Sequence, residues 1–163
     1  SGNSAAGNGG GVANLGGTVT SINSTITDNR ADSDNNSTGT GGGIHHGSGT
    51  TTLHNTIVAG NFNEDGTTDA ADDISGTVNA ASSFNLIGAG GAGTLVNGVN
   101  NNQVGVVNAG LGALADNGGL VNTHALSGTS AAVETGGNVN LPADTFDLDG
   151  DLIHLRGRGY PSL

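Results

Sequence analysis

The chain carries the same pattern twice. Residues 9–29 and residues 41–61 align without a gap, so each position of the first copy recurs 32 residues later. Gly11 falls on Gly43 and Val12 on Ile44. A repeat of this length is typical of one supersecondary unit that stacks on its own copy. We therefore predict that residues 41–61 lie directly on residues 9–29.

Each copy predicts short strands. It begins with glycines, continues through β-branched residues and Thr with apolar side chains at alternate places, and ends at an Asn-containing turn. No apolar stripe of helical period appears in either copy. Strands stacked in register lie about 4.8 Å apart. The predicted fold class is therefore all-β, a parallel β-helix or β-solenoid with about one coil per 32-residue repeat, long polar loops and a less regular C-terminal segment.

Stacking places equivalent side chains one above the other. We predict that Asn23 and Asn55 form a side-chain ladder in which one amide bonds to the next. The frequent glycines are expected at the corners of the coils, where positive φ angles and close backbone approach are needed.

The whole chain, 1–163, is predicted to be one domain. It comprises repeat coils over 1–87, a Gly/Asn-rich loop over 88–103 and a closing segment over 104–163. Ser1–Asn3 matches the last residues of both repeats, so we expect the chain to begin at the last turn of a coil. That coil then needs a cover, supplied by preceding coils or by a neighbouring molecule.

Composition and charge limit the classes of molecule that this protein can bind. The net charge is −11, there is no Lys, and the three Arg are Arg30, Arg156 and Arg158, which disfavours nucleic acid and anionic membranes as partners. The absence of Cys excludes disulfides, thiol catalysis and zinc–thiolate sites. No apolar run is long enough to insert into a membrane. No leader or initiator Met opens the sequence, and we expect a processed or partial product. Export of the protein is compatible with this sequence.

Two polar loops are expected to project from the coils. Residues 30–40 contain overlapping N-glycosylation sequons at Asn35 and Asn36, and a third sequon lies at Asn23. An unmodified, solvated loop is the favoured alternative to glycosylation. Residues 62–73 carry five carboxylates, which indicate either a cation site or a repulsive rim. The alternative, which we favour, is a solvated insertion. The five carboxylates are Glu64, Asp65, Asp69, Asp72 and Asp73.

Several motifs resemble one family in residue type and in order along the chain. They are Asn55–Asn61, Asp73–Val78, Asn85–Gly88, Leu114–Gly119 and Thr123–Leu126. Together they resemble the choice-of-anchor Q domain of bacterial surface proteins. The resemblance implies a right-handed parallel β-helix of the pectate-lyase type at the cell surface or outside the cell, without implying an enzyme. The chain departs from the family in losing the prolines usual around residues 108–114 and 128–136, and no anchor segment follows its arginine-glycine ending.

Three groups of residues could support chemistry. Asp147, Asp149 and Asp151 alternate as the oxygen ligands of a Ca²⁺ loop do, although an acidic turn explains them equally well. Apart from this Ca²⁺, we predict no cofactor.

His124 with Asp116 could form a general base and its orienting carboxylate, but a histidine bonded to turn backbone is favoured. His45, His46 and His54 could in principle collect a transition metal, but adjacent strand residues point to opposite faces.

We therefore predict a structural extracellular or cell-surface protein, a homo-oligomer whose unlike ends join head to tail into a filament or fibre. The alternative is an adhesin or glycan-binding domain. A polysaccharide lyase or glycoside hydrolase is disfavoured, because a lyase needs cationic groups against an acidic sugar and no carboxylate pair is spaced for hydrolysis. We predict no catalytic residue.

Overall fold

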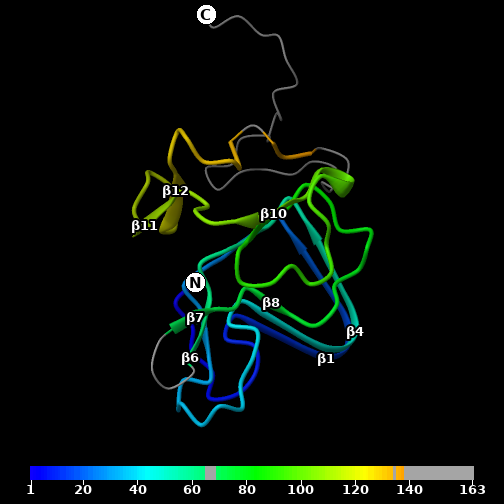
Figure 1. Cartoon of the computed structure of the whole chain (residues 1–163). Coiled ribbons are helices and arrows are strands. Elements are labelled where there is room, and N and C mark those ends of the chain that lie inside the picture. The colour runs from blue at the N-terminus through cyan, green and yellow to red at the C-terminus, as the bar shows by residue number, and fades with distance from the viewer. Residues whose placement is uncertain (65–68, 134, 138–163) are drawn as a thin grey trace, which may run out of the picture.

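The protein is seen here as a computed structural model, which describes residues 1–64, 69–133 and 135–137 (Figure 1). The described chain is all-β apart from one short 3₁₀ turn at Val99–Asn101. Its first sheet contains β1 (Val12–Ile22), β4 (Ile44–His54) and β8 (Ile74–Ser75) in that order. The second contains β2 (Thr25–Ile26), β5 (Ile57–Val58), β9 (Leu86–Gly88) and β10 (Gln103–Val106). The third contains β3 (Arg30–Ala31), β6 (Phe62–Glu64) and β7 (Asp69–Ala71).

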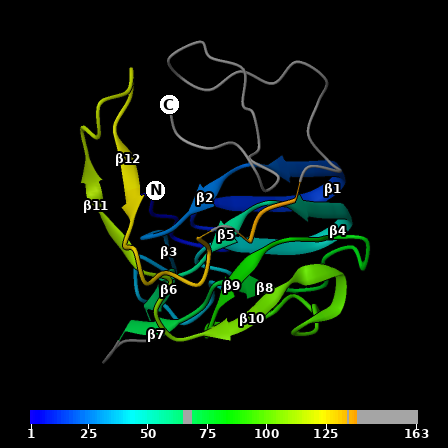
Figure 2. The same cartoon turned by 90° about the horizontal axis from the view of Figure 1, so that it is seen from above.

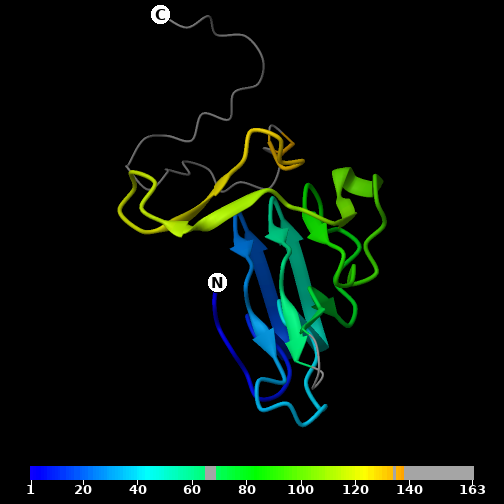
Figure 3. The same cartoon turned by 60° about the vertical axis from the view of Figure 1, so that its left-hand side comes forward.

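The second repeat lies on the first, as predicted. Strands β1 and β4 pair in parallel with Val12 opposite Ile44 and Ile22 opposite His54, which keeps the 32-residue offset at both ends of the ladder. Figure 3 shows these two long strands side by side. Strands β2 and β5 continue the same register, and so do β3 and β6. A bulge near Leu15 shifts the pairing by one residue before the offset is restored.

The repeat length is not kept beyond the second copy. Ile74 pairs with Ile44, Leu86 with Ile57, and Gln103 with Leu86, so the offset falls well below 32 residues as the stack continues. The sheets are also mixed, because β7 runs antiparallel to β6. The described chain is thus all-β with mostly parallel pairing, in mixed sheets whose successive layers are separated by shorter connections.

A narrow apolar interior follows directly from this register. Ile26, Val58, Ile87 and Val104 pair in sequence across the second sheet and form one column of side chains. These residues join the main core cluster, in which Val58 and Ile87 have no exposed surface. Alternation along short strands therefore gives each layer only a few inward apolar residues, which explains how a chain with 33% hydrophobic residues has a dry core.

Glycines occupy corners where another backbone passes close by. At Gly42, an added Cβ would overlap the backbone of Phe62, and Gly10 has the same relation to Arg30 one layer below. Gly17 and Gly49, 32 residues apart, have φ angles of +84° and +88°. The glycine-rich start of each repeat is therefore required by stacking, since side chains there would force the layers apart.

A hairpin stands apart from the stacked layers. Strands β11 (Leu111–Ala115) and β12 (Thr123–Leu126) pair antiparallel with each other and with no other strand described (Figure 2).

Residues 138–163, which belong to the predicted closing segment over 104–163, lie outside the described residues. Much of the predicted loop at 88–103 is free of strand, although β9 ends and β10 begins at its borders.

Candidate functional site

The most regular polar feature is a buried amide ladder that runs up one corner of the stack. Asn3 Nδ2 donates to Asn29 Oδ1 at 2.8 Å, and Asn29 Nδ2 donates to Asn61 Oδ1 at 2.9 Å. Asn61 Nδ2 donates to Asp73 Oδ1 at 2.9 Å, and Asp73 Oδ2 accepts from the backbone N–H of Gly90 at 3.0 Å. The Asp73 carboxylate therefore ends the ladder as an acceptor on both oxygens.

A second ladder joins the second repeat to the layers that follow it. Asn85 Oδ1 accepts from the backbone N–H of Thr56 at 2.9 Å, and Asn85 Nδ2 donates to Asn102 Oδ1 at 2.9 Å. Asn102 Nδ2 then donates to two backbone carbonyl oxygens, those of Ser82 and Val99. Both ladders satisfy backbone groups at corners, where no strand neighbour can do so.

The ladder therefore does not lie at Asn23 and Asn55. These residues do stack, but both are in the left-handed region with φ near +50°, and no described hydrogen bond joins their side chains. Asn23 is exposed, whereas the Asn55 amide bonds the backbone of Gly137 through both its oxygen and its nitrogen, at 2.7 and 2.6 Å. Asn is suited to this position because it tolerates positive φ. The pair Asn29 and Asn61 carried the same sequence signal, since it also recurs at the repeat offset.

The acidic segment after Asn61 is partly neutralised by Arg30. The Arg30 guanidinium contacts Glu64 Oε1 at 2.5 Å and donates hydrogen bonds to both carboxylate oxygens of Asp69, at 2.6 and 3.0 Å. The hydrogen bond to Asp69 is the main cause that raises the pKa of Arg30 above its ordinary value. The guanidinium also lies 5.9 Å from the centre of the Phe62 ring. Two carboxylates of this segment therefore form an ion-pair rim.

The remaining described carboxylates of that segment support the backbone. Asp73 is buried in the ladder, and Asp72 Oδ2 accepts from the N–H of Gly41 at 2.6 Å. The favoured prediction of a solvated insertion therefore needs correction at these two positions, which lie within the stack. Asp65 lies outside the described residues.

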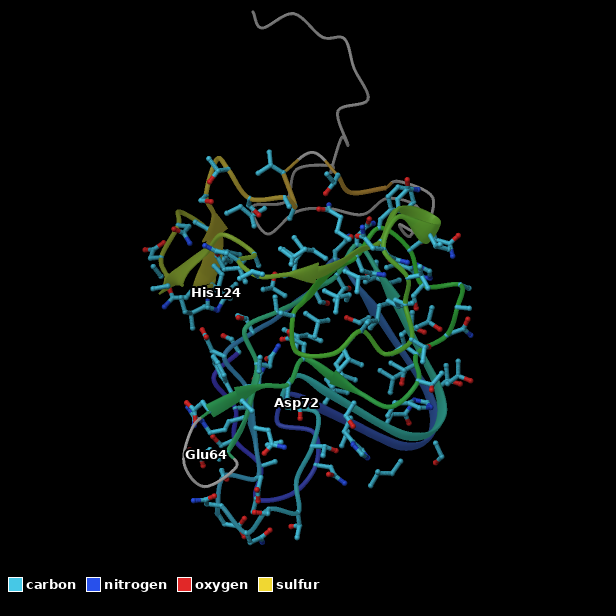
Figure 4. All side chains as sticks on the ribbon, in the orientation of Figure 1. Glu64, Asp72 and His124 are labelled. Atoms are coloured by element: carbon cyan, nitrogen blue, oxygen red, sulfur yellow. The ribbon has the colours of Figure 1, made fainter. Side chains whose placement is uncertain are left out.

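His124 and Asp116 do not form a catalytic pair. The Nδ1 atom of His124 lies 2.9 Å from the carbonyl oxygen of Gly112, so Nδ1–H donates there and Nε2 accepts from Ser1 Oγ at 2.9 Å. Asp116 Oδ1 accepts from the N–H of Gly118. Figure 4 shows His124 on the hairpin, well away from Glu64 and Asp72. The Nδ1 atom thus joins β12 to β11 within the hairpin, and the Nε2 atom joins the hairpin to Ser1.

The other histidines within the described residues bond hydroxyl groups on separate parts of the first sheet. The Nδ1 atoms of His45, His46 and His54 lie 3.2, 2.9 and 3.0 Å from hydroxyl oxygens of Thr40, Thr51 and Ser83. Burial lowers the pKa of His54. Within the described ranges, no three His, Cys, Asp or Glu residues gather into a metal-binding group.

The predicted modification and cation sites are placed as follows. Asn35 and Asn36 lie exposed in the loop between β3 and β4, and the Asn36 amide bonds to Asp34 and Thr38. The predicted Ca²⁺ ligands Asp147, Asp149 and Asp151 lie outside the described residues.

One surface cavity brings two carboxylates together. It has a volume of about 340 Å³, and its lining includes Asp28, Phe62 and Asp73. Because both Asp73 oxygens accept backbone or amide hydrogens, this carboxylate is already engaged and is a poor general acid or base.

No helix in the described part of the chain has the length and apolar character needed to cross a membrane. Comparisons of the chain with protein-family models, with curated proteins and with solved structures gave no match.

Proposed function

We propose that this chain is a right-handed parallel β-helix that serves as a structural subunit of an extracellular or cell-surface filament. The fold part of the proposal is supported by three parallel pairings at the 32-residue offset, by the apolar column through the second sheet and by the amide ladder at one corner. Membership of the choice-of-anchor Q family is part of the same proposal and rests on the sequence motifs.

The open edge of β1 is the observation that carries the assembly part of the proposal. β1 is the outermost strand of its sheet, it is eleven residues long, and it pairs only with β4 among the described strands. Along its middle, residues 15–18 are exposed, with Leu15 at 70%. A long edge strand presents unpaired N–H and C=O groups to which another chain can add a strand.

The described residues cover only part of this end. Ser4 bridges to Arg30, and the N–H of Ala5 donates to the Arg30 carbonyl oxygen at 2.9 Å, so residues 1–8 lie along β3. β1 receives no such cover from the described residues. In the proposed filament, a second copy of the chain adds a strand to β1, which makes the contact head to tail because the two ends differ.

Enzymatic alternatives find less support. Cleavage of an acidic polysaccharide needs a cationic group to bind the uronate, and Arg30, the only arginine or lysine within the described residues, is engaged by Glu64 and Asp69. An adhesin or glycan-binding domain remains the alternative among binding functions. The adhesin alternative differs from the filament proposal, because it requires a soluble glycan ligand and does not require a filament.

Thr20→Pro tests the proposal at the open edge. The N–H of Asn23 donates to His54, so by alternation along the strand the N–H of Thr20 points away from β4. Proline there blocks strand addition and leaves the β1–β4 ladder intact. We expect ordered filaments of the wild-type chain by negative-stain electron microscopy and single particles of Thr20→Pro with the wild-type circular dichroism spectrum.

Thr52→Pro is the matched control, because Thr52 is the register partner of Thr20 in the central strand and its N–H faces β1. This variant should lose folded structure rather than assembly alone. Monodisperse wild-type particles, or filaments that persist in Thr20→Pro, would contradict the assembly proposal. Binding to a glycan array by such particles would favour the adhesin alternative.

A further inference from the structure

The loop between β3 and β4 holds a carboxylate with an unsatisfied oxygen. Asp32 is 1% exposed, and its Oδ1 accepts from the backbone N–H groups of Asn36 and Thr38 at 3.1 and 3.4 Å. Its Oδ2 is buried and has no hydrogen-bond partner among the residues that the structure describes. Because both oxygens are bonded to the same carbon atom, Oδ2 lies beside the oxygen that accepts from Asn36 and Thr38.

A buried carboxylate oxygen without a donor is unfavourable, and a cation is the group that would satisfy it best. The protein has no Lys, and the nearby Arg30 already binds Glu64 and Asp69. Within the described residues no other Lys or Arg is left to compensate Asp32, so we look to a cation from solution.

The loop supplies further oxygen ligands beside Asp32. Asp34 and Asn36 follow at alternate positions and are exposed, and the main-chain oxygen of Thr38 comes next. Residues at positions 1, 3, 5 and 7 provide the ligands at the start of a Ca²⁺-binding loop, where position 7 uses its carbonyl oxygen. Position 6 of such a loop is a glycine at a sharp turn, and here Ser37 has a φ angle of +62°.

The present bonds within the loop are ones that a cation can replace. Asn36 Nδ2 donates to Asp34 Oδ2 at 2.8 Å, and the Thr38 hydroxyl donates to Asn36 Oδ1. Turning the Asn36 amide frees both oxygens for a metal ion. The loop offers two carboxylates, one amide oxygen and one carbonyl oxygen. It is therefore a different kind of site from a cluster of three or more acidic or histidine residues, and the described chain has no such cluster.

We propose that residues 32–38 bind one Ca²⁺ through Asp32, Asp34, Asn36 and the carbonyl oxygen of Thr38, with water completing the coordination. Ca²⁺ is favoured over Mg²⁺ because it accepts an irregular set of oxygen ligands, whereas Mg²⁺ demands near-ideal octahedral geometry. The inference rests on the loop alone and holds whether or not the protein forms filaments.

Thermal unfolding of the full chain, followed by circular dichroism, tests the site. Extracellular Ca²⁺ modules bind with a Kd of about 1 mM, so about 10 mM CaCl₂ should raise the folding equilibrium constant about 11-fold over EDTA. For a chain of this size, that corresponds to a rise in Tm of about 3–6 °C. The same concentration of MgCl₂ should give a smaller rise.

Asp34→Ala should abolish this rise and leave the Tm in EDTA unchanged, because the Asp34 side chain is exposed and accepts only from the Asn36 amide. Asp116→Asn is the matched control, which removes one exposed carboxylate elsewhere and should keep the rise. The triple variant Asp147→Asn, Asp149→Asn, Asp151→Asn should keep it as well. Equal Tm values of the wild type in EDTA and CaCl₂, a rise that survives Asp34→Ala, or a rise lost in the triple variant would each overturn the proposal.

Discussion

Replacing Asn61 by alanine tests the amide ladder at its centre. The Asn61 side chain is fully buried, and its Oδ1 is the acceptor for both the backbone N–H and the Nδ2 of Asn29, at 3.1 and 2.9 Å. Its Nδ2 donates to Ile26 O and Asp73 Oδ1. These two acceptors have other donors, the N–H groups of Ala59 and of residue 61 itself. Only the two Asn29 donors therefore lose their sole partner.

The magnitude follows from those two groups. A buried donor left without a partner costs about 1–3 kcal/mol, so we expect Asn61→Ala to lower the free energy of unfolding by about 4 kcal/mol. Because whole domains are stable by only about 5–15 kcal/mol, this loss is large and shifts the urea midpoint strongly. Equilibrium urea unfolding followed by circular dichroism measures it.

Asn23→Ala is the matched control. Asn23 also recurs at the repeat offset, but its side chain is exposed and has no described hydrogen bond. Only the left-handed backbone conformation is affected there, at a cost of about 1 kcal/mol. Similar losses for the two variants would refute the reasoning that places the ladder at Asn61.

Three further predictions concern the corners, the ion-pair rim and pH. Gly42→Ala should lower the free energy of unfolding in urea by about 1–3 kcal/mol, because its Cβ would overlap the Phe62 backbone. Gly7→Ala should leave the free energy of unfolding unchanged, because a Cβ there meets open space. Equal effects of the two substitutions would contradict the close-approach argument. Arg30→Gln should lower the Tm at low salt and by less at high salt, because exposed ion pairs are screened; a salt-independent change would argue against an electrostatic role. Since burial lowers the pKa of His54, the unfolded chain binds a proton more readily, so stability should fall as pH drops below the ordinary value of 6.5. Urea midpoints at about pH 5.5 and about pH 7.5 should therefore differ less in His54→Gln than in the wild type, and an equal difference would exclude His54 as the cause.

The part of the fold that could be predicted from the sequence is the part with a repeated pattern. The 32-residue offset recurs in the pairing of Val12 with Ile44 and of Ile26 with Val58, because stacked copies bury the same alternating side chains. The third layer pairs at other offsets, which are set by the lengths of its connections. Connection length leaves no periodic signal in the chain.

The polar positions were harder to predict, because Asn has two uses at a corner. It tolerates positive φ at Asn23 and Asn55, and it supplies a bridging amide at Asn29 and Asn61. The residue type and the offset are the same in both cases, so only the backbone conformation distinguishes them. Buried Asp32 was missed for a similar reason, since its loop resembled an ordinary solvated one in composition.

The central claim is that residues 41–61 stack on residues 9–29 in register, and paired nitroxide labels test it most directly. The chain contains no Cys, so labels attach only at introduced sites. Thr20 and Thr52 are register partners, whereas Ser48 lies four residues before Thr52 in β4, roughly 13 Å from it. Strong dipolar broadening of the electron paramagnetic resonance spectrum in Thr20→Cys/Thr52→Cys, and clearly weaker broadening in Thr20→Cys/Ser48→Cys, is the predicted result. Equal broadening in the two pairs, or stronger broadening in the second, would contradict the stacked register.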